Sequence, residues 1–298
     1  LPVLKSEFYF PIVVQAFQDT TCTSDALQAQ SMRFVDNTTT KKLFTRFNDA
    51  DICASLNATT ITQIGHGTID DSPYGICNLA QLKHLHQNFS THTNKGFVLL
   101  ADLDLNPWTK GGTGTAFHAC LQTGSTFIPL GLDDCTDTVP LTFSGVFNGN
   151  DHTIRGFRYR APEDPTVQGK IGFISEVNVS ALVRNITFDQ AQVSGLDYVG
   201  VAVGRGPGYI THVTVKRSEA EAETSNSYVG GVIGDNGGSG NILFSHVSET
   251  VVRGRSYLGG IAGGAASISN SSFDGNVLSE KQNCNTEYVG GIAGAASN

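Results

Sequence analysis

One glycine-rich, apolar heptad occurs four times in the second half of the chain. It reads YVGVAVG at 198–204, YVGGVIG at 228–234, YLGGIAG at 257–263 and YVGGIAG at 288–294. The tyrosines that open the heptads, Tyr198, Tyr228, Tyr257 and Tyr288, are 30, 29 and 31 residues apart. A repeat period of this length is typical of stacked architectures, in which each unit buries its apolar face against the next unit.

The segments between the heptads alternate apolar and polar residues. They include LVRNITFDQAQVSG, YITHVTVKRSEAEAE, ILFSHVSETVVRGR and SISNSSFDGNVLSE. A period of two residues predicts strands, whereas an amphipathic helix would show a period of about 3.6. Each unit is therefore expected to form two or three short strands with their turns. The sequence predicts an all-β fold and, within that class, a parallel β-helix, or β-solenoid.

Glycines recur at a fixed place in every heptad. The first column contains Gly200, Gly230, Gly259 and Gly290. Such a column indicates a sharp turn or a close approach of another segment. Strict alternation leaves neither side of the heptad polar, so two arrangements are open. Either the Gly-Gly step is a corner and both apolar groups face one core, or the outer face is a platform of tyrosine, glycine and aliphatic side chains that another element or a partner covers.

The overall composition supports this fold class and excludes some partners. Glycine accounts for 34 of the 298 residues and only 15% of residues are charged, which favours short strands and turns over helical bundles. The formal net charge is -8, so no basic field is available for nucleic acid or an anionic bilayer. No apolar run approaches the roughly 18 residues that a membrane span needs. We expect no membrane span in this chain and no nucleic-acid partner.

Six cysteines occur without any C-x-x-C pair, at positions 22, 53, 77, 120, 135 and 284. An even count without that motif argues against a zinc site and for disulfides formed in an oxidising compartment. The candidates are Cys22, Cys53, Cys120 and Cys135, and the favoured pair is Cys120 with Cys135, because these two flank a short turn and strand. Sequence alone does not select one of the possible pairings, and some of these residues could instead be buried free thiols.

One helix is predicted, over residues 78–89. Its apolar residues fall on one helical stripe: Leu79, Leu82, Leu85 and Phe89. Asn78 is the expected N-cap, and Gln81 follows three residues later, as in a capping box. Two other asparagines, Asn185 and Asn270, lie inside the repeat units. They are expected to serve as turn residues there.

An ordered series of motifs resembles the GLUG-repeat family of secreted and surface-anchored proteins. The series runs through QLKHL, FVLLADLDL, Trp108, IPLG, FSGVFNGNDHTIRGF, IGFIS and VRNITF to the repeated YVGGIAG. The resemblance covers about residues 76–298. It implies a right-handed parallel β-helix capped by the helix near residues 78–89. It also implies roles in adhesion, surface display and accessory modules of large exoproteins, some of them immunoglobulin A protease-like.

Two expectations follow from the extent of that resemblance. Residues 76–298 are expected to form the β-helix, and residues 1–75 a segment of separate character that contains cysteines and serves for binding or capping. The heptad at 198–204 departs from the family pattern, because Val201 stands where the other heptads have their second glycine. We expect this rung to turn differently.

Few carboxylates fall in patterns that suggest chemistry. Asp102 and Asp104 are two apart in an expected strand and would share a face, which is the minimum for a catalytic pair, although the family resemblance makes this strand structural. The acidic cluster Asp133, Asp134 and Asp137 has the ligand type that calcium prefers, but it lacks glycine-punctuated ligand spacing. A solvated acidic turn is the favoured interpretation of that cluster.

Other polar residues do not form a catalytic or metal-binding set. Arg205, Asp235 and Gly264 follow three of the heptads at equivalent places, so that column is not of one chemical type. His84 and His86 are two apart on the predicted helix and so lie on different faces. We therefore expect no catalytic residue, no metal site and no cofactor.

These observations together predict an extracellular or cell-surface binding module that is not an enzyme. Its expected partner is a glycan or a protein on another cell surface. One alternative is a polysaccharide-degrading enzyme, a lyase or glycosidase, because parallel β-helices commonly host such activities. Another is a structural stalk, part of a longer fibre or closed by homo-oligomer formation.

Overall fold

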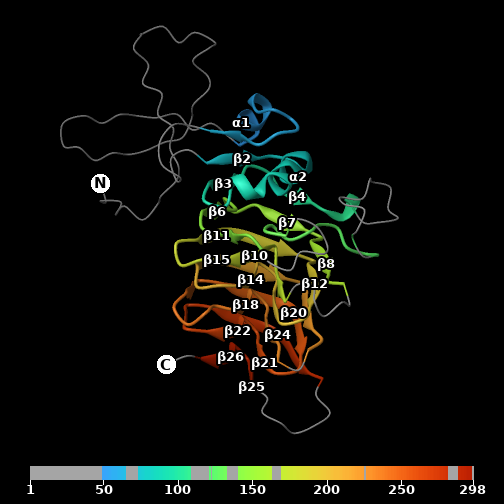
Figure 1. Cartoon of the computed structure of the whole chain (residues 1–298), viewed down its shortest axis with the longest axis vertical. Helices are drawn as coiled ribbons and strands as arrows, with labels where there is room; N and C mark the ends of the chain where they lie inside the picture. The colour runs from blue at the N-terminus through green and yellow to red at the C-terminus, as the bar shows by residue number, and fades with distance from the viewer. Residues whose placement is uncertain are drawn as a thin grey trace, which may run out of the picture.

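The computed structural model describes residues 49–64, 73–108, 121, 123–132, 140–162, 169–224, 226–280 and 288–296. In this part of the chain the strands stack as successive rungs along the long axis of the molecule, from α1 (Asp49–Ser55) at one end to β25 (Tyr288–Gly290) and β26 (Ala293–Ala296) at the other (Figure 1). The pairing is parallel from rung to rung. The predicted all-β, parallel β-helix fold is confirmed.

Three sheets form the faces of the coil. In the described residues they have 15, six and five strands. The strands of the 15-stranded sheet are β1 (Thr62–Gln63), β2 (Tyr74–Ile76), β3 (Gly96–Leu99), β4 (Leu103–Asp104), β6 (Val146–Asn148), β7 (Thr153–Arg155), β8 (Arg158–Arg160), β11 (Leu182–Asp189), β12 (Gln192–Gly195), β15 (Tyr209–Lys216), β16 (Glu219–Ala222), β19 (Asn241–Leu243), β20 (His246–Gly254), β23 (Ser267–Ser269) and β24 (Ser272–Ser279). The other two sheets are narrower and run beside it.

The six-stranded sheet contains β5 (Thr142–Phe143), β10 (Ile174–Val177), β14 (Val203–Arg205), β18 (Ile233–Asp235), β22 (Ala262–Ala265) and β26. The five-stranded sheet contains β9 (Lys170–Ile171), β13 (Tyr198–Gly200), β17 (Tyr228–Gly230), β21 (Tyr257–Gly259) and β25. One rung therefore visits all three sheets, as in the succession β15, β16, β17 and β18.

The four heptads lie directly over one another. Tyr228 pairs with Tyr198 on one side and with Tyr257 on the other, and Tyr257 pairs in turn with Tyr288. The first glycines of the heptads, including Gly230, follow in the same register. Each heptad supplies one strand to the five-stranded sheet and one to the six-stranded sheet.

The Gly-Gly step of the heptad is a corner between these two sheets. Val229 before it and Val232 and Ile233 after it are all fully buried, so both apolar groups of the heptad face one core, as in the first of the two arrangements considered. A Cβ added at Gly230 would overlap the backbone of Ile233 and Ala262, so the first glycine allows a close approach of backbone.

The prediction that the rung of Val201 turns differently is wrong. Gly200 pairs with Gly230 and Val203 pairs with Ile233, so the register is the same on both sides of the corner. Val201 itself is fully buried. The larger side chain packs into the core, and the path of the backbone does not change.

The core runs the length of the stack and changes in composition along it. Its largest fully buried side chains in the N-terminal rungs are phenylalanines: Phe97, Phe127, Phe143, Phe147, Phe157, Phe173 and Phe188. Valine, isoleucine and alanine replace them in the later rungs, as at Val213, Val229 and Ala262. Period-two alternation places these residues inward and their polar neighbours outward.

The predicted helix is α2 (Leu79–Gln87), at the N-terminal end of the stack (Figure 1). The side chain of Asn78 accepts a hydrogen bond from the backbone N–H of Gln81, and the Gln81 side chain accepts one from the backbone N–H of Cys77. Leu82 and Leu85 are fully buried against the first rungs. The helix therefore covers apolar surface that the first rung would otherwise expose.

Two single-turn 3-10 helices follow, η2 (Phe89–Thr91) and η3 (Asn106–Trp108).

The sequence did not predict α1 or its covalent link to the coil. Cys53 of α1 forms a disulfide with Cys77, which precedes α2. The expected domain boundary after residue 75 falls within β2, and β2 pairs with both β1 and β3. The described residues 49–64 and 73–75 thus share hydrogen bonds and a disulfide with the coil.

Several expectations concern residues outside the described part of the chain. They involve Cys22, Cys120, Cys135, the acidic cluster at 133–137 and residues 1–48. In the described residues, no helix has the length and apolar character needed to cross a membrane.

Candidate functional site

Two hollows open on the outer surface of the 15-stranded sheet. The first, the Phe244 hollow, has a volume of about 360 Å³, and its lining residues are Asp151, Asn185, Ile186, Thr187, His212, Thr214, Phe244 and His246. They come from β11, β15, β20 and the turns beside them. The register places Thr187, Thr214 and His246 in one column across three rungs. Because these strands are hydrogen-bonded to one another, the backbone fixes the spacing of the lining side chains.

Aromatic and hydroxyl groups characterise this first hollow. The rings of His212 and Phe244 stack with centroids 5.0 Å apart and 22° between their planes. His212 Nδ1 is 2.8 Å from the hydroxyl of Thr211, and His246 Nδ1 is 2.8 Å from the hydroxyl of Ser272. Phe244 remains 43% exposed. The hollow thus combines an apolar edge with several groups that can donate or accept hydrogen bonds.

Left-handed backbone marks one side of the Phe244 hollow. Asn185, His212, Phe244 and Asn270 have φ angles of 51°, 53°, 47° and 50°. They occupy the same place in successive rungs, because the residues before them are paired in register. Asn270 directly follows β23, as expected of a turn residue, whereas Asn185 lies inside β11, so the left-handed position falls within a strand in that rung.

The second hollow, the Glu221 hollow, has a volume of about 230 Å³ and lies farther along the same sheet. Its lining residues are Thr123, Gly124, Ser125, Arg158, Tyr159, Arg160, Gln192, Val193, Ser194, Glu219 and Glu221. Two columns cross β8, β12 and β16: Arg158, Gln192 and Glu219 form one, and Arg160, Ser194 and Glu221 the other. Most of these lining side chains are charged or carry a hydroxyl group. The one aromatic residue among the described lining residues, Tyr159, is buried.

The two carboxylates of the Glu221 hollow have different surroundings. Glu219 lies 3.5 Å from Arg253 Nε, and the same guanidinium contacts Glu280 at 3.3 Å. Burial raises the pKa of Glu221, and the charges of Glu219 and Glu280 raise it further. Two neighbouring carboxylates in unlike environments can divide the acid and base roles of a hydrolytic reaction.

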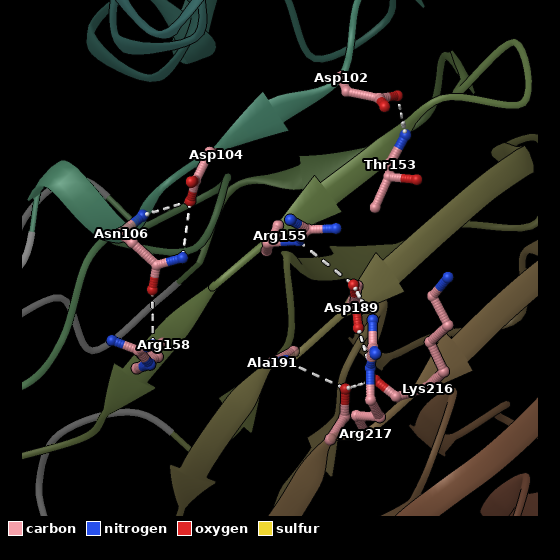
Figure 2. A network of polar contacts seen from close by, with 11 residues as sticks. Asp102, Asp104, Asn106, Thr153, Arg155, Arg158, Asp189, Ala191, Lys216 and Arg217 are labelled. Carbon is pink, nitrogen blue, oxygen red and sulfur yellow. Dashed lines mark hydrogen bonds and ion pairs between the residues drawn. The ribbon is translucent and has the colours of Figure 1, made fainter.

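Asp102 and Asp104 have structural partners (Figure 2). Asp102 accepts a hydrogen bond of 2.8 Å from the backbone N–H of Thr153. Asp104 accepts bonds from the backbone N–H and side-chain amide of Asn106, at 3.0 and 2.7 Å. Asp102 thus binds the start of β7, and Asp104 binds the start of η3.

Asp189 is the buried charge of this region (Figure 2), and sequence reasoning did not single it out. Its side chain has no exposed surface, and Arg217 binds it through two hydrogen bonds of 2.9 and 2.6 Å. Arg155 Nε lies 3.3 Å away on the other side. Burial by itself raises the pKa of Asp189, but the hydrogen bond and charge of Arg217, with the charges of Lys216 and Arg155, outweigh it and hold the pKa below its usual value. This network joins three rungs and is structural.

The repeated tyrosines form a stacked column on the outside of the corner, the tyrosine ladder (Tyr198, Tyr228, Tyr257 and Tyr288). Successive ring centroids are 5.3, 4.2 and 4.9 Å apart. The guanidinium of Arg205 lies 4.4 Å from the ring centroid of Tyr198. Because the ring faces contact one another or Arg205, most of the ladder offers a ligand only ring edges and hydroxyls.

The remaining candidates lie apart from both hollows. Arg205, Asp235 and Gly264 share one register position, and Arg205 Nε contacts Asp235 at 3.2 Å. His86 is buried, with its ring 5.6 Å from that of Phe127. In the part of the chain that the structure describes, no group of three His, Cys, Asp or Glu residues could hold a metal ion.

Sequence reasoning passed over the residues that line both hollows. The run EAEAE at 219–223 carried a usable signal, because alternation with buried alanines places Glu219 and Glu221 on one outer face. The signal at Phe244 was weaker. Phe244 is the third large apolar residue in a row in ILFSHV, and this run interrupts the alternation of apolar and polar residues. Which outward side chains of successive rungs line one hollow together could not be read from the chain.

Comparison with known proteins gives few relatives. No family model matches the chain. The chain is 26% identical over 176 residues to halomucin of Haloquadratum walsbyi; this match covers 57% of the chain, which spans only 2% of halomucin. A crystal structure of a candidate immunoglobulin A1 protease from Bacteroides ovatus aligns with a TM-score of 0.43 and 19% identity, over 71% of this chain and 68% of that one.

Proposed function

We propose that this chain is an extracellular or cell-surface binding module that recognises a glycan or a protein on another surface and does not act as an enzyme. The observation that carries the proposal is the exposure of two aromatic side chains on the rigid outer sheet. Tyr209 and Phe244 are 46% and 43% exposed, and Phe244 lines an open hollow. Exposed aromatic side chains on a rigid surface are typical of binding sites, because they offer contact area at low entropic cost.

The extracellular part of the proposal is supported by the Cys53–Cys77 disulfide, since such bonds persist in oxidising environments. The likeness of part of the chain to halomucin is consistent with it. Membership of the GLUG-repeat family belongs to the same proposal and is supported by the four heptads in register. Hydrogen-bonded rungs provide a scaffold that loses little freedom when a ligand binds.

Glycan and cell-surface protein arrays, probed with the full chain, test the proposal. We expect saturable binding to a limited set of glycans or proteins, with the bound material recovered uncleaved. The double variant Glu219→Gln/Glu221→Gln should bind as the unchanged chain does, because these groups lie outside the Phe244 hollow. Absence of binding to every glycan and protein on both arrays would overturn the proposal.

A polysaccharide-degrading enzyme is the second candidate, and the Glu221 hollow is the observation that favours it. A glycosidase needs one carboxylic acid that keeps its proton and one carboxylate that does not. The raised pKa of Glu221 and the contact of Glu219 with Arg253 are consistent with those two roles. Incubation with a panel of polysaccharides, followed by measurement of new reducing ends, decides between the candidates. Release of reducing ends by the unchanged chain but not by Glu221→Gln would establish the enzyme. If no reducing ends are released, the binding module is the remaining candidate.

A further inference from the structure

We propose that the Phe244 hollow is a binding site for a single pyranose ring of a glycan, with Phe244 as its apolar contact. This inference rests on the proposed binding function and deepens it by naming a ligand class and a position. Three independent features of the hollow carry it: the backbone at Phe244, the exposure of its ring, and the chemistry of the lining.

The backbone at Phe244 is unusual for that residue type. Left-handed φ angles suit asparagine, whose short polar side chain can hydrogen-bond locally, and Asn185 and Asn270 occupy this position in two other rungs. Phenylalanine at a φ of 47° lacks that compensation and is strained. Strained residues that persist are concentrated at functional sites.

Burial does not compensate for this strain. The Phe244 side chain is 43% exposed, and its ring contact is with His212, which is itself at left-handed φ and exposed. A phenylalanine that served only the fold would be expected inside, where Phe173 and Phe188 are fully buried. An aromatic side chain at this position is therefore better explained by a contact that the free chain lacks.

The lining matches the two-sided character of a sugar ring. A pyranose presents an apolar patch of C–H groups and a rim of hydroxyls that donate and accept hydrogen bonds. The stacked rings of His212 and Phe244 provide an apolar contact, and Thr187, Thr214 and His246 provide polar groups in register. The volume of about 360 Å³ lies at the lower end of the range of ligand pockets, which suits one ring.

Charge in the Phe244 hollow favours a neutral ligand. Asp151 is the one acidic residue of the lining, and neither lysine nor arginine is among the described residues that line it. A phosphate or sulfate group would find no strong cationic partner there. The Glu221 hollow, with Arg158 and Arg160, differs in this respect and is not part of the site.

Saturation-transfer difference NMR with the full chain tests this assignment. The probes are the methyl glycosides of glucose, galactose, mannose, N-acetylglucosamine and N-acetylgalactosamine, each titrated into the protein at neutral pH. We expect saturable binding of at least one glycoside with a millimolar dissociation constant and the largest transfer to ring C–H protons.

The decisive variant is Phe244→Asn, which inserts the residue found at this position in the rungs of Asn185 and Asn270. We expect at least tenfold weaker glycoside binding with an equal or higher midpoint of thermal unfolding, because asparagine relieves the backbone strain. Phe244→Tyr keeps a ring and should bind within about twofold of the unchanged chain. Tyr288→Ala removes an aromatic side chain of similar exposure, 46%, from the last rung and should not change binding.

The outcomes separate this inference from the broader proposal. Glycan-array binding that Phe244→Asn leaves unchanged refutes the Phe244 site and leaves the binding module intact. If the chain binds a protein on the array and none of the glycosides, the Phe244 site is likewise refuted and the binding module stays intact. A lower unfolding midpoint in Phe244→Asn would show that the ring serves the fold, and this also overturns the inference. Loss of all array binding by the unchanged chain would remove the proposed function itself.

Discussion

The ring of Tyr228 lies 4.2 Å from the ring of Tyr257, centroid to centroid, with 8° between their planes. Both residues occupy one register position in neighbouring parallel strands. Strands in a sheet are about 4.8 Å apart, which is close to the stacking distance of aromatic rings, so parallel pairing by itself brings the rings face to face. The tyrosine ladder therefore ties the rungs together outside the core.

Replacement of Tyr257 by alanine should destabilise the coil. Tyr257 contacts Tyr228 on one side and Tyr288 on the other, and each aromatic pair contributes about 0.5–1.5 kcal/mol beyond area burial. We expect the free energy of unfolding to fall by about 2–3 kcal/mol in denaturant titrations. Tyr257→Phe keeps both ring contacts, so its free energy of unfolding should fall by less than about 1 kcal/mol. Equal losses of unfolding free energy in the two variants would contradict a stacking role.

The ladder should also produce an alkaline transition. Burial, followed by the charge and hydrogen bond of Tyr257, raises the pKa of Tyr228 to about 12. Because the folded-state pKa is higher than the unfolded value of about 10, this contribution to stability is complete below pH 10 and is lost as the pH rises towards 12. Midpoints of thermal unfolding, measured from pH 8 to pH 12, should fall between pH 10 and pH 12. The midpoint of Tyr228→Phe should fall less steeply over the same range.

Asp189→Asn should weaken the coil at neutral pH. The native carboxylate is fully buried and bound by Arg217 and Arg155, and removal of its charge leaves both guanidinium groups without their partner. We expect a loss of about 2–3 kcal/mol in unfolding free energy at pH 7.

The same substitution has a defined pH dependence. Because the folded-state pKa of Asp189 is lowered, its contribution is present above the unfolded pKa of about 3.9 and disappears as the pH falls through the folded value. The difference between Asp189→Asn and the unchanged chain should therefore shrink below pH 4. Asp104→Asn, at the exposed end of β4, is the control and should show little change at either pH, because the amide oxygen of asparagine can still accept the hydrogen bonds from Asn106.

Two glycines at one register position should respond in opposite ways to alanine. A Cβ at Gly260 would overlap the ring of Phe273 and the carbonyl of Gly291, whereas a Cβ at Gly291 would have no atom within 4 Å. Gly260→Ala should lower the free energy of unfolding by about 1–3 kcal/mol through overpacking. Gly291→Ala should be neutral or slightly stabilising. Equal effects in thermal unfolding would contradict the close packing assigned to the corner.

Removal of the Cys53–Cys77 disulfide should loosen α1 without unfolding the coil. The bond closes a loop with a sequence separation of 24 residues, for which chain-entropy estimates give about 3 kcal/mol. In the double variant Cys53→Ser/Cys77→Ser, hydrogen exchange should accelerate in residues 49–64 and stay unchanged in β20. Peptide mapping of the unreduced chain should recover Cys53 linked to Cys77.

The repeat made the fold predictable. Equivalent residues in the four heptads face equivalent neighbours, so the spacing of Tyr198, Tyr228, Tyr257 and Tyr288 already implied a stack of parallel strands. The helix at α2 was equally accessible, because an apolar stripe and an N-cap are local signals. The exception was Val201, where a local rule about glycine was overridden by the register that the neighbouring rungs impose.

The candidate sites were less accessible. The Phe244 hollow combines residues as far apart as Asp151 and His246, and the Glu221 hollow combines Ser125 with Glu221. Alternation shows which side chains face outward, but not which outward side chains of different rungs lie next to one another. That depends on the exact number of residues in each turn between strands.

The sequence by itself determined the coil, because a period of about 30 residues with period-two alternation inside it has few stable solutions other than stacked strands. Only the tertiary structure decided that Phe244 stands in strained backbone beside an open hollow, that Asp189 is buried between two arginines, and that Cys53 joins Cys77. Local patterns set the direction and burial of a side chain. Its neighbours across rungs are set by pairing between distant segments, which local patterns do not encode.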